Sequence, residues 1–444
     1  MGIRLTGETR SAVAMHEPEQ ETMTPPKAVL DEHSPGYYGW RVLAVSVVGM
    51  ALSVGPLFWG SLGLLVGSLQ TQFGWSRAQI MLALTWLTLT SVPAMPIVGR
   101  LIDRFGARRV LLPSIAVLAV TLAAVPFCVA SRWHFYACFA LAGFLTVGTQ
   151  SVSYIRILSS WFDRRRGLAI GIAASGLGLG YLVVPMIVQA VLSVEDWPAV
   201  YWAMAALVGF VSLPLMYAVV RNDPPSDEAR SGTVGAAARA SGGMLLAEAL
   251  RTREFWLIAA GIFIAATVFN SMLPTMAPML TDRGMTAESA AFAVSIMGLA
   301  MFISRISVGY LIDVVFAPVV AAAVFALSTV GLILLAAESS GAVAVLAAFL
   351  IGLGFGAETD LMGVLVSRYF GLKAFGQIYG IMLAIFVIAT GSGPYLAGLA
   401  YEAQGSYVGL LISFSALGAA SAALFLFCRS YTLVSAAPAR TGGA

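Results

Sequence analysis

Residues 99–110 read Gly-Arg-Leu-Ile-Asp-Arg-Phe-Gly-Ala-Arg-Arg-Val and stand between two long apolar runs, the first of which ends with Pro93 and Pro96. Four of these twelve residues are arginine, and Asp103 is the only acid among them. Lysine and arginine gather in the cytoplasmic loops of membrane proteins. We therefore expect residues 99–110 to form a short cytoplasmic loop that joins two membrane-spanning segments.

The composition of the whole chain agrees with a membrane location. Of 444 residues, 59% are hydrophobic and 11% are charged, which is more apolar surface than one soluble core buries. The net charge of +3 is small, and the arginines lie between apolar runs, which argues against a nucleic-acid partner. The cysteines and histidines are scattered, without the spacing of a metal site or a catalytic triad. We therefore expect a protein embedded in the lipid bilayer that uses no metal and no cofactor.

About twelve apolar stretches, each near the ~20 residues that cross a hydrocarbon core, follow Tyr37. They cover residues 38–66, 77–98, 109–130, 133–160, 166–192, 199–220, 254–281, 289–312, 316–337, 341–368, 374–399 and 406–429. In lipid the backbone must satisfy its own hydrogen bonds, so each stretch is expected to be a helix. The loops on the side of residues 99–110 hold nearly all the loop arginine and lysine. Both termini are therefore expected in the cytoplasm, and the protein is expected to be multi-pass in the inner (plasma) membrane.

A polar break divides the twelve stretches into six and six. Residues 221–253 are rich in Gly, Ala, Ser and charge, and they are expected to be a cytoplasmic linker. The linker would join an N-terminal bundle at 37–220 to a C-terminal bundle at 254–430. Residues 1–36 and 431–444 are expected to be cytoplasmic tails, the first of them disordered.

The two halves also repeat each other. Gly-Arg-Leu-Ile-Asp at 99–103 recurs as Gly-Tyr-Leu-Ile-Asp at 309–313, an offset of 210 residues (309 minus 99), and Pro185 and Pro394 keep nearly that offset. Repeats of this kind are typical of transporters whose halves enclose a central site. The sequence thus predicts an all-α membrane protein with 12 transmembrane helices in two pseudo-symmetric six-helix bundles.

The loop stretch resembles the signature of the major facilitator superfamily, G-x-L-x-D-R-x-G-x-R-R. The matching positions are Gly99, Leu101, Asp103, Arg104, Gly106, Arg108 and Arg109. Two further stretches, Tyr38-Gly-Trp40 and Trp161-Phe-Asp-Arg-Arg-Arg-Gly-Leu-Ala169, are similar to the monocarboxylate and oxalate:formate transporter branch of that superfamily. The resemblance implies the major facilitator fold, a small organic anion as substrate, and transport by alternating access of a central site.

The chain departs from this branch at three positions. Animal monocarboxylate carriers place a lysine in helix 1 and an acid one turn before the arginine of helix 8, where this chain has Gly60 and Met301. The lysine that oxalate:formate carriers have in helix 11 also has no match, because residues 375–397 contain no Lys or Arg. The coupling mechanism of neither family can simply be transferred, and a dicarboxylate substrate is disfavoured.

Arg305 lies inside the apolar stretch 289–312. An arginine near the bilayer centre costs at least ~2.5–3.5 kcal/mol, so we expect it to face a wet cavity or a partner. Its planar fork suits bidentate binding of a carboxylate, and its position resembles that of the branch's substrate-binding arginine. We expect Arg305 to bind the substrate; the alternative is a structural arginine paired with a buried acid.

Glu358 and Asp360 lie inside the apolar stretch 341–368. Two residues apart on a helix means a rotation of ~200°, so the two carboxyl groups cannot share one face. We expect one to face the cavity and the other a neighbouring helix. Each is a candidate proton carrier or counter-ion of Arg305, the alternative being a structural salt bridge between helices.

Other polar groups inside the apolar stretches could orient a substrate, although each alone is more often an interhelical hydrogen bond. They are Asn270, Gln150, Tyr154 and Tyr379. Arg156 stands near the cytoplasmic end of its stretch and is expected to have a structural or gating role.

The loop stretch itself is assigned to gating. We expect Asp103 and Arg104 to join the cytoplasmic ends of the two halves when the opposite side is open, with flanking glycines allowing the tight turn. The repeat in the second half keeps Asp313 but has no arginine. The expected gating residues are Gly99, Asp103, Arg104, Gly106, Arg108, Arg156 and Asp313.

Together these features predict a secondary active transporter of a small organic anion, with a monocarboxylate as the expected substrate, coupled to protons by symport. One alternative is an organic-anion exchanger, which would need a counter-anion and would ignore a pH gradient. Another is a membrane sensor derived from a transporter. An enzyme is not expected, because no nucleophile, base or metal set can be assembled from the sequence.

Overall fold

The computed structural model of the chain describes residues 34, 37–129, 131–162, 165–220, 243–337, 341–371 and 373–431. These residues are mostly helical. Eleven of their helical segments are long and apolar enough to cross a membrane. Both tails expected from the sequence, apart from a few residues, and residues 221–242 of the expected linker lie outside the described residues.

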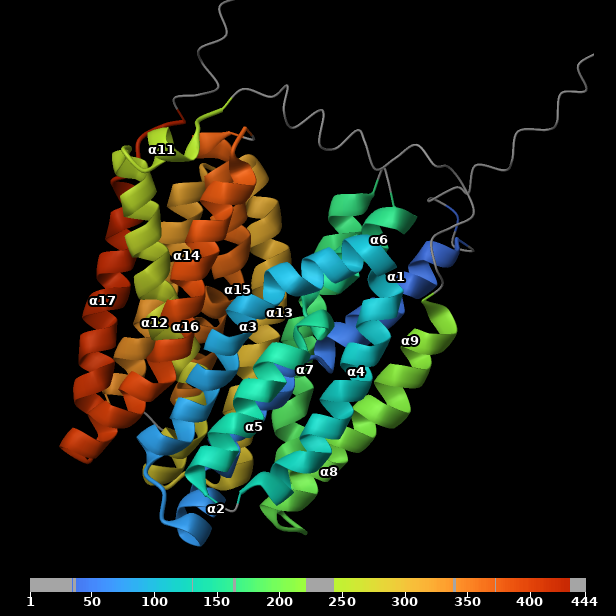
Figure 1. The fold of residues 1–444 in the computed structure, drawn as a ribbon. Coiled ribbons are helices and arrows are strands. Elements are labelled where there is room, and N and C mark those ends of the chain that lie inside the picture. The colour runs from blue at the N-terminus through green and yellow to red at the C-terminus, as the bar shows by residue number, and fades with distance from the viewer. Residues whose placement is uncertain are drawn as a thin grey trace, which may run out of the picture.

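Two groups of helices stand side by side in Figure 1, the blue to green group on one side and the yellow to red group on the other. The first group contains α1 (Tyr38–Ala51), α2 (Val54–Phe73), α3 (Arg77–Phe105), α4 (Ala107–Ala124), η1 (Val125–Cys128), α5 (Arg132–Leu145), η2 (Val147–Thr149), α6 (Ser151–Trp161), α7 (Arg166–Leu192), α8 (Trp197–Ala206), η3 (Leu207–Ser212) and α9 (Leu213–Val219). The second group contains α11 (Leu246–Ala249), α12 (Arg253–Asp282), α13 (Ala287–Val314), α14 (Ala317–Ala336), α15 (Ala342–Phe370), α16 (Phe375–Gln404) and α17 (Val408–Leu426).

The basic stretch 99–110 is not a loop, contrary to the expectation from its charge. Helix α3 continues to Phe105 with Pro93 and Pro96 inside it, and α4 begins at Ala107. Only Gly106 separates the two helices, with a φ of 84° that a residue without a Cβ adopts at little cost. Because one glycine suffices to reverse the chain, Gly99 stays helical and takes no part in the turn.

The expected single span at 133–160 is broken into two helices. Helix α5 ends at Leu145, a short 3-10 turn follows, and Gln150 has an extended backbone (φ −83°, ψ 176°) before α6 begins. An extended residue cannot continue the i→i−4 hydrogen-bond ladder, so α6 has to start anew. The break lies within the first group and shortens both helices.

The two groups meet mainly along three helix pairs, α3 with α16, α7 with α13, and α2 with α12, and α2 also touches α13. Glycines permit the close approach: a Cβ at Gly63 of α2 would collide with the backbone of Pro274 in α12, and one at Gly398 of α16 would collide with Ala78 in α3. Small residues let membrane helices approach backbone to backbone in this way.

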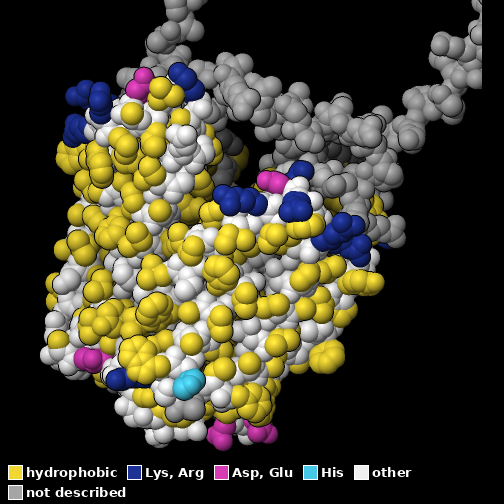
Figure 2. All heavy atoms as spheres, viewed as in Figure 1, with side chains coloured by type: hydrophobic (Ala, Val, Ile, Leu, Met, Phe, Trp, Pro, Cys, Tyr) yellow, Lys and Arg dark blue, Asp and Glu magenta, His cyan; other side chains and the backbone are white. Residues whose placement is uncertain are grey.

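The two ends of the molecule differ in charge and in how closely the two groups of helices approach each other. We call the end at the α3–α4 turn the Gly106 end and the end where α3 begins the Arg77 end. In Figure 2 basic side chains gather near the Gly106 end, and the surface between the two groups is hollowed there. The helix pairs just described close the molecule toward the Arg77 end.

Candidate functional site

Arg305 of α13 faces α15 and meets one of the two candidate acids. Its Nη1 lies 3.1 Å from Oδ1 of Asp360, and its Nη2 lies 3.4 Å from the hydroxyl of Thr359. The Arg305 side chain is 9% exposed and that of Asp360 is 33% exposed. Asp360 therefore reaches open space while its partner is nearly covered.

The pairing of Arg305 with Asp360 leaves part of the guanidinium unsatisfied. Within the described residues, the Nε of Arg305 is buried and has no hydrogen-bond partner. Nε and Nη2 form one of the two edges through which a guanidinium binds a carboxylate bidentately. Because Asp360 holds Nη1 at a single point, this second edge has only the long contact to Thr359.

Glu358 is bound by a different helix from the one that holds Asp360. The side chain is 1% exposed, and its Oε2 accepts a hydrogen bond of 2.7 Å from Nδ2 of Asn270 in α12. Within the described residues its Oε1 has no partner. The carboxyl groups of Glu358 and Asp360 thus lie toward different neighbouring helices, as a rotation of ~200° requires.

Aromatic residues from α15 and its neighbouring helices lie close to the two acids. Phe355, one turn before Glu358, meets Tyr181 of α7 edge to face with ring centroids 5.3 Å apart. Tyr379 of α16 stacks on Phe375 and approaches Gly363, one turn after Asp360. Of the expected substrate residues, Asn270 and Tyr379 therefore lie beside the acids of α15.

The expected polar residues of the first group do not meet Arg305 in this conformation. Tyr154 is fully buried and packs against α1 at Gly49, so its hydroxyl reaches no open space. Gln150 caps α6 at the helix break and is partly exposed, and Arg156 is exposed on α6.

The expected gating residues lie at the Gly106 end. Asp103 and Arg104 are exposed, and the Arg104 guanidinium lies over the ring of its own neighbour Phe105. Arg108 donates a hydrogen bond of 3.0 Å to the carbonyl of Tyr217, so it joins two helices of the same group. The side chain of Asp313 lies outside the described part of the structure.

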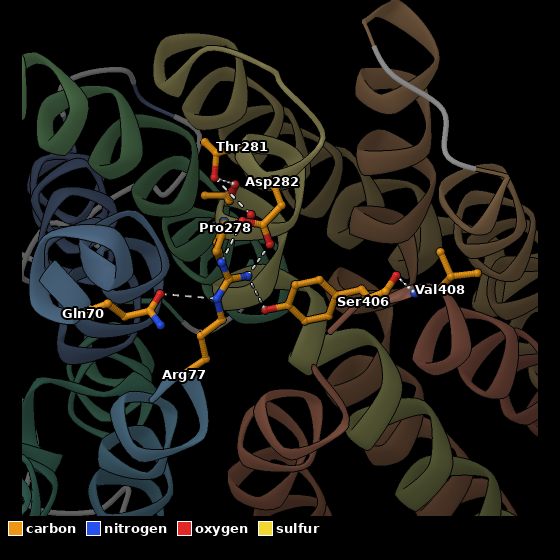
Figure 3. A network of polar contacts seen from close by, with 9 residues as sticks. Gln70, Arg77, Pro278, Thr281, Asp282, Ser406 and Val408 are labelled. Carbon is orange, nitrogen blue, oxygen red and sulfur yellow. Dashed lines mark hydrogen bonds and ion pairs between the residues drawn. The ribbon is translucent and has the colours of Figure 1, made fainter. Parts of the chain in front are cut away.

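A second charged cluster, not expected from the sequence, closes the opposite end (Figure 3). Arg77 at the start of α3 binds Asp282 at the end of α12 through both nitrogens, with Nη1–Oδ2 at 2.5 Å and Nη2–Oδ1 at 2.7 Å. Its Nη1 also donates to the hydroxyl of Tyr407 at 3.2 Å, and its guanidinium carbon lies 3.9 Å from the centroid of the Tyr401 ring. We call Arg77, Asp282, Tyr401, Glu402 and Tyr407 the Arg77 cluster.

Two further features strengthen the Arg77 cluster. Glu402 accepts a hydrogen bond of 2.9 Å from the backbone N–H of Ala78, which is an unpaired donor in the first turn of α3. Burial raises the pKa of Tyr407 to about 12, although the nearby Arg77 opposes the rise. Tyr407 is therefore a neutral acceptor at physiological pH, and Asp282 supplies the charge that pairs with Arg77.

Sequence reasoning missed this cluster because its partners are far apart in the chain. Arg77 and Asp282 are separated by 205 residues, and each looks like an ordinary loop charge. One signal was present: Arg77 is one of few cations on a side otherwise rich in acids, which is where a paired cation would be expected.

Comparison with known proteins decides the family. The model of the Major Facilitator Superfamily matches residues 43–394. The chain belongs to this superfamily. With the helical structure, the match confirms the expected resemblance and the expected fold class, including a multi-pass location in a membrane.

The relatives of this major facilitator protein are distant. An MFS-type transporter of Gibberella moniliformis is 27% identical over 83% of this chain and 88% of its own length. Monocarboxylate transporter 11 of Homo sapiens is 25% identical over 87% of this chain and 82% of its own. The oxalate:formate antiporter of Oxalobacter formigenes is 28% identical over 59% of this chain and 60% of its own. The relatives therefore indicate a transport protein and leave the cargo open.

Proposed function

We propose that this protein carries a small monocarboxylate across the inner membrane together with a proton, by alternating access of a site at Arg305. The observation that carries the proposal is the state of the Arg305 guanidinium. It is nearly buried inside a membrane-spanning helix, is held by Asp360 at one nitrogen, and leaves its Nε without an acceptor.

A substrate carboxylate would complete this arrangement. An unsatisfied buried donor costs about 1–3 kcal/mol, and a carboxylate on the Nε–Nη2 edge would remove that cost while adding a charge-assisted pair. The aromatic pair of Tyr181 and Phe355 supplies an apolar surface on the neighbouring turn of α15 for the rest of the substrate.

Asp360 is the proposed proton carrier. When a substrate anion pairs with Arg305, Asp360 loses part of its counter-charge in a place that is only one-third exposed. A second carboxylate beside one guanidinium favours protonation of one of the two. Substrate and proton would then bind together, and the empty site would return as the neutral pair of Arg305 and Asp360.

The position of Asp360 offers a replacement for an acid that this chain lacks relative to the monocarboxylate branch. That branch carries its acid on the same helix as the arginine, where this chain has the buried Met301. Here α15 supplies an acid at 3.1 Å from the same guanidinium. We propose that the coupling acid has moved to the neighbouring helix with its function retained.

The charged stretch at the Gly106 end is proposed as the gate of the opposite conformation. In the present conformation the Arg77 cluster joins the two groups at one end, and Asp103 and Arg104 are exposed at the other. In the proposed topology the Gly106 end and both termini are cytoplasmic, because arginine gathers there. This conformation would then face the cytoplasm.

Uptake into proteoliposomes tests the proposal. We expect an imposed pH gradient to drive accumulation of a labelled monocarboxylate from a panel that includes lactate and benzoate. Arg305→Lys keeps the charge and loses the planar fork, so we expect at least about a tenfold lower kcat/KM. Arg132→Lys, an exposed arginine outside the site, is the matched control. An unchanged kcat/KM in Arg305→Lys for every transported acid would overturn the role of Arg305.

Anion exchange is the second candidate, favoured by the similarity to the oxalate:formate antiporter. An exchanger would need a counter-anion inside the vesicles and would not respond to the pH gradient. The same vesicles, loaded with or without unlabelled acid, separate the two modes. Binding of the acid without any transport would instead indicate a sensor.

A further inference from the structure

Arg77 makes nearly all its contacts with the opposite group of helices. Asp282, Tyr401 and Tyr407 all belong to the second group, whereas Arg77 begins α3 of the first. Among the described residues, Gln70 is its hydrogen-bond acceptor from its own group, with Oε1 3.4 Å from Nε. When the Arg77 end opens, the guanidinium must therefore lose its carboxylate, its hydroxyl and its ring together.

A polar cavity of about 400 Å³ lies beside this guanidinium and between the two groups. Its polar lining comes from both groups and includes Ser68, Gln70, Arg77, Gln189, Thr281 and Asp282. A volume of this size accommodates a small organic acid. Figure 3 shows Gln70 and Asp282 on either side of the Arg77 guanidinium.

Asp282 itself shows how a carboxylate sits on Arg77. Its two oxygens lie 2.5 and 2.7 Å from the two terminal nitrogens, which is the fork geometry of a strong carboxylate pair. The Arg77 side chain is only 10% exposed in the closed state. An arginine remains charged in every state of the protein, so it needs a new anion or water once Asp282 leaves.

We infer that Arg77 is a first binding point for the carboxylate of the substrate at the Arg77 end, a position that Asp282 occupies while this end is closed. This inference rests on the proposed function. An entering carboxylate replaces Asp282 on the guanidinium and thereby favours the open state of this end. Substrate and gate then compete for one cation.

The acids around the cavity give the position a charge preference. Glu195 and Asp196, between α7 and α8, line the cavity together with Asp282. The three carboxylates around one cation repel a dianion more strongly than a monoanion. This relative preference for a monoanion agrees with the proposed monocarboxylate substrate. Oxalate, a dianion, therefore serves as the probe that is expected to bind less well.

Two substitutions separate capture of the substrate from simple closure of the gate. Arg77→Gln and Asp282→Asn both destroy the ion pair, so a purely closing role predicts the same change in both. If Arg77 also captures the carboxylate, Arg77→Gln raises the KM for uptake from that side by about tenfold or more, whereas Asp282→Asn leaves the KM within about twofold or lowers it. Equal KM values in the two variants would overturn the inference.

A measurement that requires no transport tests this inference independently of the proposed function. Spin labels at Val194→Cys and Ala403→Cys, exposed positions at the Arg77 end on opposite groups, report the separation of that end. The background replaces Cys128, Cys138 and Cys428 and carries Arg305→Gln, which removes the central site.

We expect lactate or benzoate to increase the population with long distances relative to sodium chloride of equal ionic strength. The increase should be absent with Arg77→Gln and smaller with oxalate. If no acid is transported by the wild-type protein yet the distances respond, the proposed function fails and the anion site stands. If the distances ignore both monocarboxylates, the inference fails whatever the transport result.

Discussion

Two carboxyl groups on one helix have different surroundings, and this difference is the basis for the different roles that we propose for them. Asp360 lies against Arg305 and is one-third exposed, whereas Glu358 is 1% exposed and bound by the amide of Asn270. A buried carboxylate without a cation is costly, so Glu358 is better suited to a constant protonation state. In the proposed cycle, Asp360 exchanges both its partner and its proton.

We therefore expect Asp360→Asn to abolish the response to a pH gradient. Substrate exchange across the membrane should persist, because Arg305 keeps its charge and a neutral partner. Glu358→Gln should keep the response and lose at most stability, since a Gln carbonyl still accepts from Asn270. The measurement is exchange and net uptake of labelled acid with and without the gradient. The reverse pattern, with Glu358→Gln insensitive to pH, would assign the proton to Glu358.

Glycines that lie two residues apart in α7 pack against different helices. A Cβ at Gly176 would collide with the carbonyl of Val47 in α1, and one at Gly180 with Ala51 and Pro56. A Cβ at Gly178 would instead lie 2.6 Å from the backbone nitrogen of Phe302 in α13. Residues two apart on a helix face opposite sides. Gly178 therefore sets the distance between the two groups at Phe302, which lies three residues before Arg305.

Gly178→Val should impair transport by separating α7 from α13. Because the collision is with backbone, no side chain can move aside, and a cost of about 1–3 kcal/mol is expected for the overpacked state. Gly171→Val on the same helix is the control, since a Cβ there meets no atom within 4 Å. Thermal stability and uptake of both variants check this. Equal uptake by the two would show that the α7–α13 contact can relax without consequence.

Charge clusters stand at both ends of the molecule, and among the described residues the Arg77 cluster joins the two groups. The Arg77 cluster is formed in this conformation, whereas Asp103 and Arg104 are exposed at the Gly106 end. Alternating access requires that the two ends do not open together. The stability of each cluster then biases the population of the two conformations.

Asp103→Asn should slow transport while sparing substrate binding. The substitution removes the acid proposed to join the groups in the opposite conformation, so the conformation seen here gains population. The expected result is a kcat lower by about fivefold with an affinity changed by less than twofold, since a coupling of this size is ~1 kcal/mol. Equal losses of kcat and of equilibrium binding in a thermal-shift titration would contradict the gating role of Asp103.

Much of the molecule followed from the sequence alone. Most helices, the family and the three charges of the proposed site were readable because lipid tolerates neither unpaired backbone nor isolated charge, so Arg305, Glu358 and Asp360 stood out inside apolar runs. The extent of the basic stretch was misread, because arginine content indicates the side of a membrane and says little about where a helix ends.

The tertiary structure decided which of these groups meet. Whether Asp360 or Glu358 reaches Arg305 depends on the rotation of α15 against α13 and α12, which is set by packing at glycines such as Gly356 beside Met301. The pairing of Arg77 with Asp282 depends on how the two groups of helices meet, because the two residues are 205 positions apart in the chain. A local sequence pattern shows that a buried charge is costly. Which residue becomes its partner depends on how the helices are assembled.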